Sequence, residues 1–545
     1  MMEHYRLVVQ GADARVKQAV KKQVTDPSSR FYGGIRDAAN LVEAKYTIYR
    51  FTTMVAAYSC PDSAWYKDQT VFQRILLAIG YVARAQHENG LFDYIDCNFL
   101  SAPDTAFCVK RMLPALRYLQ GIERTEQQQQ LYLPLYAIVK KAANGLLLGG
   151  FHTPNHRWAI ASNLMECGQL FGDPALTAAA AQYLNEGIDG NADGEYAEKS
   201  AGNYNRINND AMITLGDVTG NAEFYQYAVR NLTMMLTYLE PDGSIFTANS
   251  TRQDNGKRIF PKDYYTEYLR MGLEQNIPEF LGMCNTIFAL VLQNNLSAPD
   301  ILIHFLNNPR WKTLEHSGIY RQPNFEKFYS ESGIMRLRHG ETTLTLMQQK
   351  ANFLYLSNQS ITLSLKIGAN FCEHRAFLPE TFEKNADGSY TLRQMMRGWY
   401  YLPFQEKPAS SDWWKMDHSK RPVLHGPNLT IEARVLPVEN GADVQVSAFG
   451  VENAPLRLEL AVAGAKEVSG AAFALPATPG GALVAKEGDV VFENQQDSLL
   501  AGPAFGEHIS MLGKFGSEAP SPHSFTLYFT AYTPFNHTFH LRSGV

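Results

Sequence analysis

The stretch NNPRWKTLEHSGIYRQPNFEKFY, residues 307–329, marks a change in the hydrophobic pattern of the chain. Before it, apolar residues recur every three to four positions, as in VFQRILLAIGYVARAQ (71–86) and EFYQYAVRNLTMMLTYL (223–239). After it, apolar and polar residues alternate, as in GIMRLRHGETTLTLMQQ (333–349) and LTIEARVLPV (429–438). The first period is that of amphipathic helices and the second that of half-buried strands. The sequence therefore predicts a helical part followed by a β part.

The helical pattern runs from about residue 35 to 300 in hairpin-like pairs, joined by long loops rich in polar and aromatic residues. Such loops are commonly binding surfaces on a rigid scaffold. We predict an incomplete (α/α) toroid over residues 1–310 that carries most of the cleft. Residues 311–545 are predicted to form an antiparallel β-sandwich.

Composition limits the class of partner. The chain has 545 residues and a formal net charge of −5, with scattered Lys and Arg, which argues against nucleic acid or an anionic membrane. No window approaches the roughly 20 apolar residues of a membrane span, and the N-terminus lacks a secretion-signal pattern. We expect a soluble protein that is cytoplasmic if the start is native, and periplasmic or secreted otherwise. An oligomer is left open. The six widely spaced cysteines, without a CxxC pair, favour buried free thiols.

The first polar motif is NHRW, which follows Pro154 at an expected helix start. It holds an amide, an imidazole, a guanidinium and an indole: Asn155, His156, Arg157 and Trp158. A helix N-terminus stabilises anions, so this motif is a candidate ligand site. The alternative is that Asn155 caps the helix, His156 is a satisfied histidine and Trp158 belongs to the core.

The second motif is NADGEYAEKSAGNYNRINND, residues 191–210, which holds Tyr204 among asparagines. A surface-packed tyrosine with its hydroxyl in water is the alternative interpretation. The third motif, GANFCEHRAFLPE at 368–380, places His374 and Arg375 after an apolar strand. Either residue is equally well a turn residue without a further role.

The order His156, Tyr204, His374 on a helical part followed by a sandwich resembles the heparinase II/III-like and alginate lyase superfamily of polysaccharide lyases. The resemblance covers the architecture of nearly the whole chain. Its local motifs are the Asn155–His156 pair and DGEYAEKSAGNY (193–204), which fits the family's acidic loop before a catalytic tyrosine.

The chain departs from this family at two positions. Asn205 stands where members usually have a histidine directly after the tyrosine, and Ala376 stands where many members have a zinc ligand. We therefore assign no metal ligands to the active site and no cofactor to the chain. A structural zinc or calcium ion in the β domain is left open.

The resemblance implies cleavage of a glycosidic bond beside a uronic acid by β-elimination, which gives a 4,5-unsaturated uronate end. The substrate carboxylate must be neutralised before the C5 proton can leave. This task is assigned to Asn155, with support from His374. An imidazole titrates near pH 6.5, which suits His156 as base, and a phenol titrates near pH 10, which suits Tyr204 as acid. The stereochemistry, and with it the choice of base, stays open.

Further substrate-binding candidates come from polar and aromatic positions near these motifs, with core or sheet-face packing as the alternative for the aromatic ones. They are Asp104, Arg157, Trp158, Asn205, Asn208, Tyr264, Tyr265, Arg375, Arg397 and Trp399. The expected partner is an acidic oligo- or polysaccharide: alginate, heparan-type glycans, hyaluronan, chondroitin and glucuronans all fit.

Two other classes of function stay open. A toroid glycoside hydrolase would use paired carboxylates such as Asp104 with Asp193 or Glu195. A non-catalytic glycan-binding protein would keep the fold without the chemistry.

Overall fold

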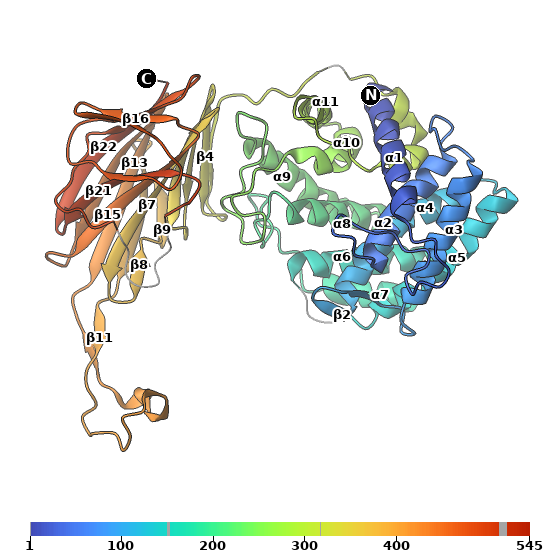
Figure 1. Cartoon of the computed structure of the whole chain (residues 1–545), viewed down its shortest axis with the longest axis horizontal. Coiled ribbons are helices and arrows are strands. Elements are labelled where there is room, and N and C mark those ends of the chain that lie inside the picture. The colour runs from blue at the N-terminus through green and yellow to red at the C-terminus, as the bar shows by residue number, and fades with distance from the viewer. Residues whose placement is uncertain (1, 150–152, 317, 512–519, 545) are drawn as a thin grey trace. The chain divides into compact units, whose positions relative to one another are not determined.

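The computed structural model describes residues 2–149, 153–316, 318–511 and 520–544 (Figure 1). The chain forms two compact units. The helical unit comprises Met1–Leu236 and Gly243–Arg321, and the sandwich unit comprises Thr237–Asp242 and Gln322–Val545. The sequence placed the boundary after residue 310, whereas the units divide after Arg321 and a short segment after the ninth helix belongs to the sandwich unit.

The helical unit consists mainly of α-helices joined by polar loops. They are α1 (Met2–Lys22), α2 (Ala44–Ser59), α3 (Gln69–Ala85), α4 (Ala102–Gln120), α5 (Glu126–Leu146), α6 (Pro154–Phe171), α7 (Pro174–Leu184), α8 (Tyr204–Thr219), α9 (Glu223–Thr237), α10 (Tyr265–Glu274), α11 (Pro278–Gln293) and α12 (Leu302–Asn307). A short hairpin, β1 (Phe92–Tyr94) with β2 (Asn98–Ser101), lies between α3 and α4, and the 3₁₀ turn η1 (Pro261–Tyr264) precedes α10. A second 3₁₀ turn, η2 (Pro309–Thr313), follows α12.

Alternate helices form an inner layer. Helices α2, α4, α6 and α8 contact one another in succession, α10 contacts α8, and α12 contacts α2 and α4. Helices α3, α5, α7 and α11 each pack against the inner helix that precedes them. This repeated hairpin arrangement turns one face of each inner helix toward a common interior, as the predicted toroid requires.

Local sequence signals set several helix ends. Asp68 accepts the amide hydrogen of Val71 at the start of α3, and Thr125 forms a reciprocal capping box with Gln128 at the start of α5. Helices α6 and α8 end at Gly172 and Gly220, which have positive φ angles of 65° and 70°. Helix α1 lies before the region in which helices were expected, although the regular spacing of its buried residues, from Val8 to Ala19, would have predicted it.

The sandwich unit contains two antiparallel sheets. One follows the order β17-β16-β19-β20-β22-β14-β13-β10-β9, and the other β18-β21-β15-β7-β6-β5-β4-β3, with β8 beside β7 and β18 parallel to β21. The strands of the first sheet are β9 (Thr381–Lys384), β10 (Tyr390–Met396), β13 (Leu429–Val438), β14 (Gly441–Phe449), β16 (Glu467–Gly470), β17 (Phe473–Pro476), β19 (Val490–Glu493), β20 (Ser498–Gly502) and β22 (Phe535–Ser543). Those of the second are β3 (Phe325–Tyr329), β4 (Ile334–His339), β5 (Thr342–Met347), β6 (Asn352–Asn358), β7 (Ile361–Phe371), β8 (His374–Ala376), β15 (Pro455–Ala463), β18 (Ala482–Val484) and β21 (Phe525–Tyr532).

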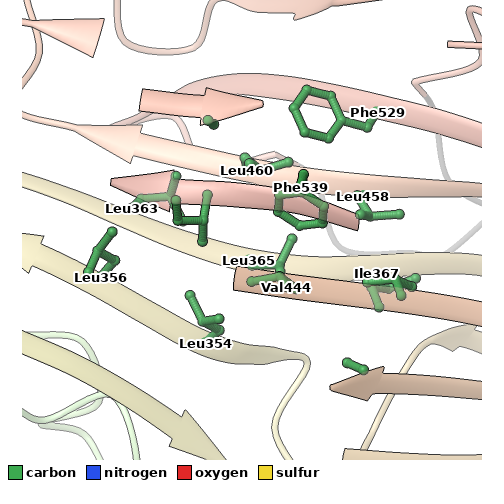
Figure 2. Packing of buried hydrophobic residues seen from close by; sticks show 14 of the residues in the cluster. Leu354, Leu356, Leu363, Leu365, Ile367, Val444, Leu458, Leu460, Phe529 and Phe539 are labelled. Atoms are coloured by element: carbon green, nitrogen blue, oxygen red, sulfur yellow. The ribbon is translucent and has the colours of Figure 1, made fainter. Parts of the chain in front are cut away.

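The inward faces of both sheets form one apolar core. Leu365 on β7 and Leu458 on β15 come from one sheet, and Val444 on β14 and Phe539 on β22 come from the other; all four are fully buried (Figure 2). Alternation of apolar and polar residues along these strands places one set inside. The predicted antiparallel sandwich is confirmed.

One long hairpin, residues 397–426, belongs to neither sheet. Its strands β11 (Trp399–Tyr401) and β12 (Val423–His425) pair only with each other, and the 3₁₀ turns η3 (Trp413–Lys415) and η4 (His418–Lys420) lie near its tip. We call this segment the aromatic arm.

Candidate functional site

A cavity of about 1400 Å³ lies among the inner helices of the helical unit. Its lining follows the helical repeat. Helix α4 contributes Asp104, Phe107, Arg111 and Pro114, and helix α8 contributes Ile207, Asp210, Thr214 and Asp217. Residues three and four apart share a helix face, so each of these two helices presents one row of mostly polar side chains to the cavity.

His156 reaches this cavity from the start of α6. The helix begins at Pro154, which follows Thr153 in an extended conformation, so His156 lies in the first turn. Its half-buried ring packs edge-on against Phe107 of α4, with 5.7 Å between ring centroids. His156 therefore lines the cavity from the first turn of an inner helix, and its role in proton transfer stays a prediction.

Tyr204 lies at the start of α8 and lines the same cavity. Its backbone amide donates to Ser200 Oγ at 3.1 Å, and its hydroxyl donates to Gln253 Oε1 at 3.1 Å. The guanidinium of Arg252 lies 5.4 Å from the centre of its ring. The structure thus places His156 and Tyr204, which are 48 residues apart in the sequence, in the lining of one cavity. The guanidinium of Arg252 lies beside the phenol ring of Tyr204.

Glu198 connects these two elements. Its carboxylate accepts hydrogen bonds from the Asn155 backbone amide at 3.0 Å and from Asn155 Nδ2 at 2.7 and 2.9 Å. Arg252 Nε lies 3.3 Å from Glu198 Oε1. A carboxylate therefore occupies the N-terminus of α6, where an anion is stabilised by free amide groups.

The placement of Asn155 differs from the position expected of a substrate contact. The side chain is fully buried, its amide group faces Glu198, and it is absent from the cavity lining. Direct contact of Asn155 with a substrate carboxylate stays a prediction. In this arrangement Asn155 fixes the first turn of α6, and Arg252 is the cation of this cluster that lies on the cavity.

The acidic loop that leads to Tyr204 is largely internal. Glu195, which is 2% exposed, accepts hydrogen bonds from Asn205 Nδ2 at 3.1 Å and Asn249 Nδ2 at 3.2 Å. Of the carboxylates suggested for a hydrolase pair, Asp104 lines the cavity, whereas Asp193 and Glu195 do not.

Ion pairs balance the charge of the cavity wall. Lys45 Nζ lies 2.8 Å from Asp104 Oδ1, Lys110 Nζ lies 2.5 Å from Asp210 Oδ2, and Arg270 Nη2 lies 2.6 Å from Asp217 Oδ1. Burial opposes ionisation of Asp210, but Lys110 outweighs it and holds the pKa of Asp210 below its usual range. An acidic ligand would meet paired charges rather than a uniformly basic surface.

Glu267 on α10 is the exception among these carboxylates. It is 4% exposed, and its Oε2 atom has no hydrogen-bond partner. Burial, reinforced by the charge of Asp210 and opposed by Arg206, raises the pKa of Glu267 to about 8. A protonated carboxyl at neutral pH is thus part of the cavity wall.

Several predicted contact residues lie away from the cavity. Trp158 is fully buried, its indole donates to Asp189, and the Arg157 guanidinium stacks on it at 4.1 Å from the ring centre. Tyr264 and Tyr265 are 2% and 0% exposed. For these three aromatic residues the structure shows the core-packing alternative.

Asn205 and Asn208 lie behind the cavity wall. They are 1% and 0% exposed and are absent from the cavity lining. Asn208 has no hydrogen-bond partner for either amide atom, whereas Asn205 donates to Glu195. In this conformation Asn205 and Asn208 are too buried to contact a substrate.

The remaining candidates belong to the sandwich unit. His374 begins β8 beside the end of β7, where Phe371 is its register partner, and Arg375 is exposed on the same strand. Arg397 is exposed at the base of the aromatic arm, and the Trp399 amide donates to Cys372 Sγ at 3.3 Å. A role for His374 at the cavity stays a prediction.

The described residues show no cluster of three or more His, Cys, Asp or Glu side chains suited to a metal ion. The methyl side chain of Ala376 on β8 cannot coordinate zinc, and a structural ion elsewhere in the β domain stays an open expectation. The six cysteines are free thiols, four of them buried, with Cys97 exposed and Cys372 half-buried. No helix in the described ranges is long and apolar enough to cross a membrane.

Sequence reasoning missed most of the charged cavity wall. Lys45, Lys110, Arg206, Arg252 and Glu267 were not singled out, although all line the cavity. Charged residues at helical spacing usually indicate a solvated face. The available signal was that Asp104, Lys110 and Arg111 interrupt the apolar pattern of α4, most of whose residues are buried.

No protein-family model and no curated protein sequence matches the chain. Several solved structures align over nearly its whole length. A Paenibacillus xanthan lyase is 10% identical, with a TM-score of 0.60, and the alignment covers 100% of this chain and 57% of that chain. A chondroitin AC lyase from Streptomyces coelicolor A3 is 11% identical, with a TM-score of 0.54 and coverage of 99% and 79%.

The heparan sulfate lyase HepC from Pedobacter heparinus is 11% identical, with a TM-score of 0.51 and coverage of 98% and 83%. The chain therefore spans 57% of the length of the xanthan lyase and larger shares of the other two. Its fold is that of polysaccharide lyases: a helical toroid followed by an antiparallel β-sandwich, as the sequence predicted.

Proposed function

We propose that this chain with a polysaccharide lyase fold cleaves a glycosidic bond at a uronic acid by β-elimination. The observation that carries the proposal is that His156 and Tyr204, at the starts of two inner helices, line one cavity. The fold alone allows other chemistry. An imidazole and a phenol on one cavity supply the two proton-transfer groups that this reaction needs.

Carboxylate neutralisation is assigned to Arg252. An ionised uronate opposes the negative charge that develops when the C5 proton leaves, so a cation or donor must face the carboxylate. Arg252 lies on the cavity beside the Tyr204 ring and is held by Glu198. Asn155 then acts as a positioning residue, because it fixes Glu198 and the first turn of α6 together.

Proton transfer follows from the same geometry. His156 accepts the C5 proton, the C5–H electron pair forms the C4–C5 double bond, and the C4–O4 bond breaks. The O4 oxygen takes the proton of the Tyr204 hydroxyl, which the hydrogen bond to Gln253 orients in the free protein. The step leaves His156 protonated and Tyr204 as a phenolate, and a proton transfer from His156 to Tyr204 through solvent restores both groups. A syn reaction in which Tyr204 performs both transfers uses the same residues.

The decisive experiment is an ultraviolet screen over acidic polysaccharides: alginate, hyaluronan, chondroitin, heparan-type glycans, xanthan and glucuronans. Elimination creates a double bond conjugated to the carboxyl, which absorbs in the ultraviolet, and mass analysis identifies the product. We expect Tyr204→Phe to lower kcat by about 10²–10⁴-fold, because the transferable proton is lost. Tyr532→Phe, at a 42% exposed tyrosine of β21, is the matched control and should leave kcat unchanged.

The screen also identifies the competing functions. New reducing ends without ultraviolet absorbance would replace the lyase with a hydrolase. Binding of a polymer without any product from the parent protein would replace it with a non-catalytic binder.

Hydrolysis is favoured by one specific observation. Glu267 and Asp210 line the same cavity with pKa values shifted in opposite directions, upward for the first and downward for the second. Two carboxyl groups whose pKa values differ in this way are typical of a general acid and its ionised partner. Glu267→Gln tests this reading, since it would abolish hydrolysis but leave elimination by His156 and Tyr204 largely intact.

A further inference from the structure

The aromatic arm exposes an unusual set of side chains. Three of the six tryptophans of the chain lie in residues 397–426. Trp414 is 90% exposed, Tyr400 is 70% exposed and Trp413 is 54% exposed. No residue from 399 to 428, all of which the structure describes, is buried. Exposed aromatic groups of this density mark interaction surfaces, because they add nothing to a core.

The tip of the arm is held in one arrangement by polar contacts. Arg421 donates from Nε to the Leu402 carbonyl and from Nη2 to the Tyr401 carbonyl, both at 3.1 Å. Its guanidinium lies 5.0 Å from the Tyr401 ring centre and 5.9 Å from that of Trp413. The Trp413 and His418 rings lie 4.0 Å apart. These contacts hold the Tyr401 and Trp413 rings in place before a ligand binds, which lowers the entropic cost of binding.

The charges around these rings indicate the class of partner. Residues 397–426 carry five Lys or Arg and three Asp or Glu, a net +2 in a chain whose formal charge is −5. Lys415 directly follows Trp414 and lies 3.3 Å from Asp412, and Lys420 lies 3.9 Å from Asp417; both pairs are exposed, and Lys407 lies in the same segment. Lysine is depleted at protein–protein interfaces, so this mixture fits a polyanion better than a second protein surface.

We propose that the aromatic arm binds the chain of an acidic polysaccharide outside the catalytic cavity. The apolar C–H faces of pyranose rings stack on Trp413, Trp414 and Tyr400, and the neighbouring cations contact uronate or sulfate groups. The proposal rests on the proposed function for its substrate class. Figure 1 shows the arm, labelled β11, extending away from the strands of the sandwich. Its strands β11 and β12 pair only with each other.

The test separates polymer binding from chemistry. Affinity electrophoresis of the full chain in gels containing acidic polysaccharide, with neutral dextran as the reference, measures binding. We expect Trp414→Ala to weaken binding about tenfold, and Trp413→Ala/Trp414→Ala to weaken it further. Tyr532→Ala is the control at another exposed aromatic residue of the sandwich unit and should bind normally.

Turnover provides the second readout. Trp414→Ala should raise KM for polymer and leave kcat on a short oligosaccharide unchanged. Arm-dependent binding without ultraviolet product would overturn the proposed function and keep the arm proposal. Product formation with unaltered binding in both arm variants would overturn the arm proposal alone. A wild-type dimer in sedimentation that Trp414→Ala dissociates, or equal arm-dependent retention by single-stranded DNA, would also overturn it.

Discussion

Arg252 illustrates how one residue can serve both structure and chemistry. It is paired with the buried Glu198, and it also faces the cavity beside Tyr204. We predict that Arg252→Met lowers kcat/KM on a uronate polymer by about 10²–10³-fold, because the cation opposite the developing charge is lost. Arg252→Lys should restore part of the loss, since the charge remains but the fixed guanidinium geometry does not.

The matched control for Arg252 is Arg258→Met in the same loop, because Arg258 packs on Phe260 and does not line the cavity. Steady-state kinetics and the melting temperature of each variant separate catalysis from folding. Equal losses at both positions would contradict the assigned role of Arg252.

Glu267 gives a prediction about pH and stability. Its folded pKa of about 8 lies above its ordinary value of 4.5, so the native state holds a proton that the unfolded chain releases between these values. The stability of the wild type should therefore fall as pH rises through this window. Glu267→Gln lacks this titration, so the melting temperature of the variant minus that of the wild type should increase as the pH rises from 5 to 9. A constant difference across that range would show that Glu267 is ionised in the folded protein.

The site was only partly predictable from residue types. His156 and Tyr204, which the resemblance to a family motif singles out, both line the cavity. The sequence could not place Tyr264 and Tyr265, since an aromatic residue in a polar loop suits a sugar face and a core equally well. Nor could it show that Glu198 occupies the helix start at Asn155, because that contact joins residues 43 positions apart.

At the scale of elements, the segment Thr237–Asp242 is anchored by a buried ion pair. Arg336 on β4 has a side chain that is 1% exposed, and its Nη2 atom lies 2.8 Å from Glu240 Oε1. Its Nε atom donates to the Thr237 carbonyl at 3.1 Å, and Thr343 donates to Glu240 Oε2 at 2.9 Å. These contacts explain why a segment that follows α9 belongs to the sandwich unit.

We predict that Arg336→Met destabilises the sandwich unit by up to about 3–5 kcal/mol, because Glu240, whose side chain is only 15% exposed, would be left without its cation. The control is Lys384→Met at the Lys384–Glu326 pair, where the side chains are 45% and 36% exposed. An exposed pair contributes about 0–1 kcal/mol. Urea unfolding measures both, and similar values for the two variants would refute the anchoring role.

At the scale of the whole molecule, periodicity was the strongest signal. The change near residues 307–329 gave the order of the two parts because helical and strand periods are set by backbone geometry. The packing of inner and outer helices depends on which helix faces meet, which the period alone does not give. In the sequence, the polar residues that line the cavity look like an ordinary solvated helix face. The two compact units divide after Arg321, whereas the change of period predicts a boundary after residue 310.

Each unit has its own apolar interior: fully buried residues such as Phe51, Ile75 and Leu135 in the helical unit, and the leucine-rich cluster around Leu365 in the sandwich unit. Separate cores permit separate cooperative unfolding. We predict two transitions in calorimetry of the full chain. Arg336→Met should lower one of them, and Glu267→Gln at pH 8 should raise the other. If both variants displace a single shared transition, the two units unfold together. The loss of stability at Arg336 would then also destabilise the helical unit that holds the cavity. Tyr204→Phe and Arg252→Met would in that case have to be compared in backgrounds of equal stability.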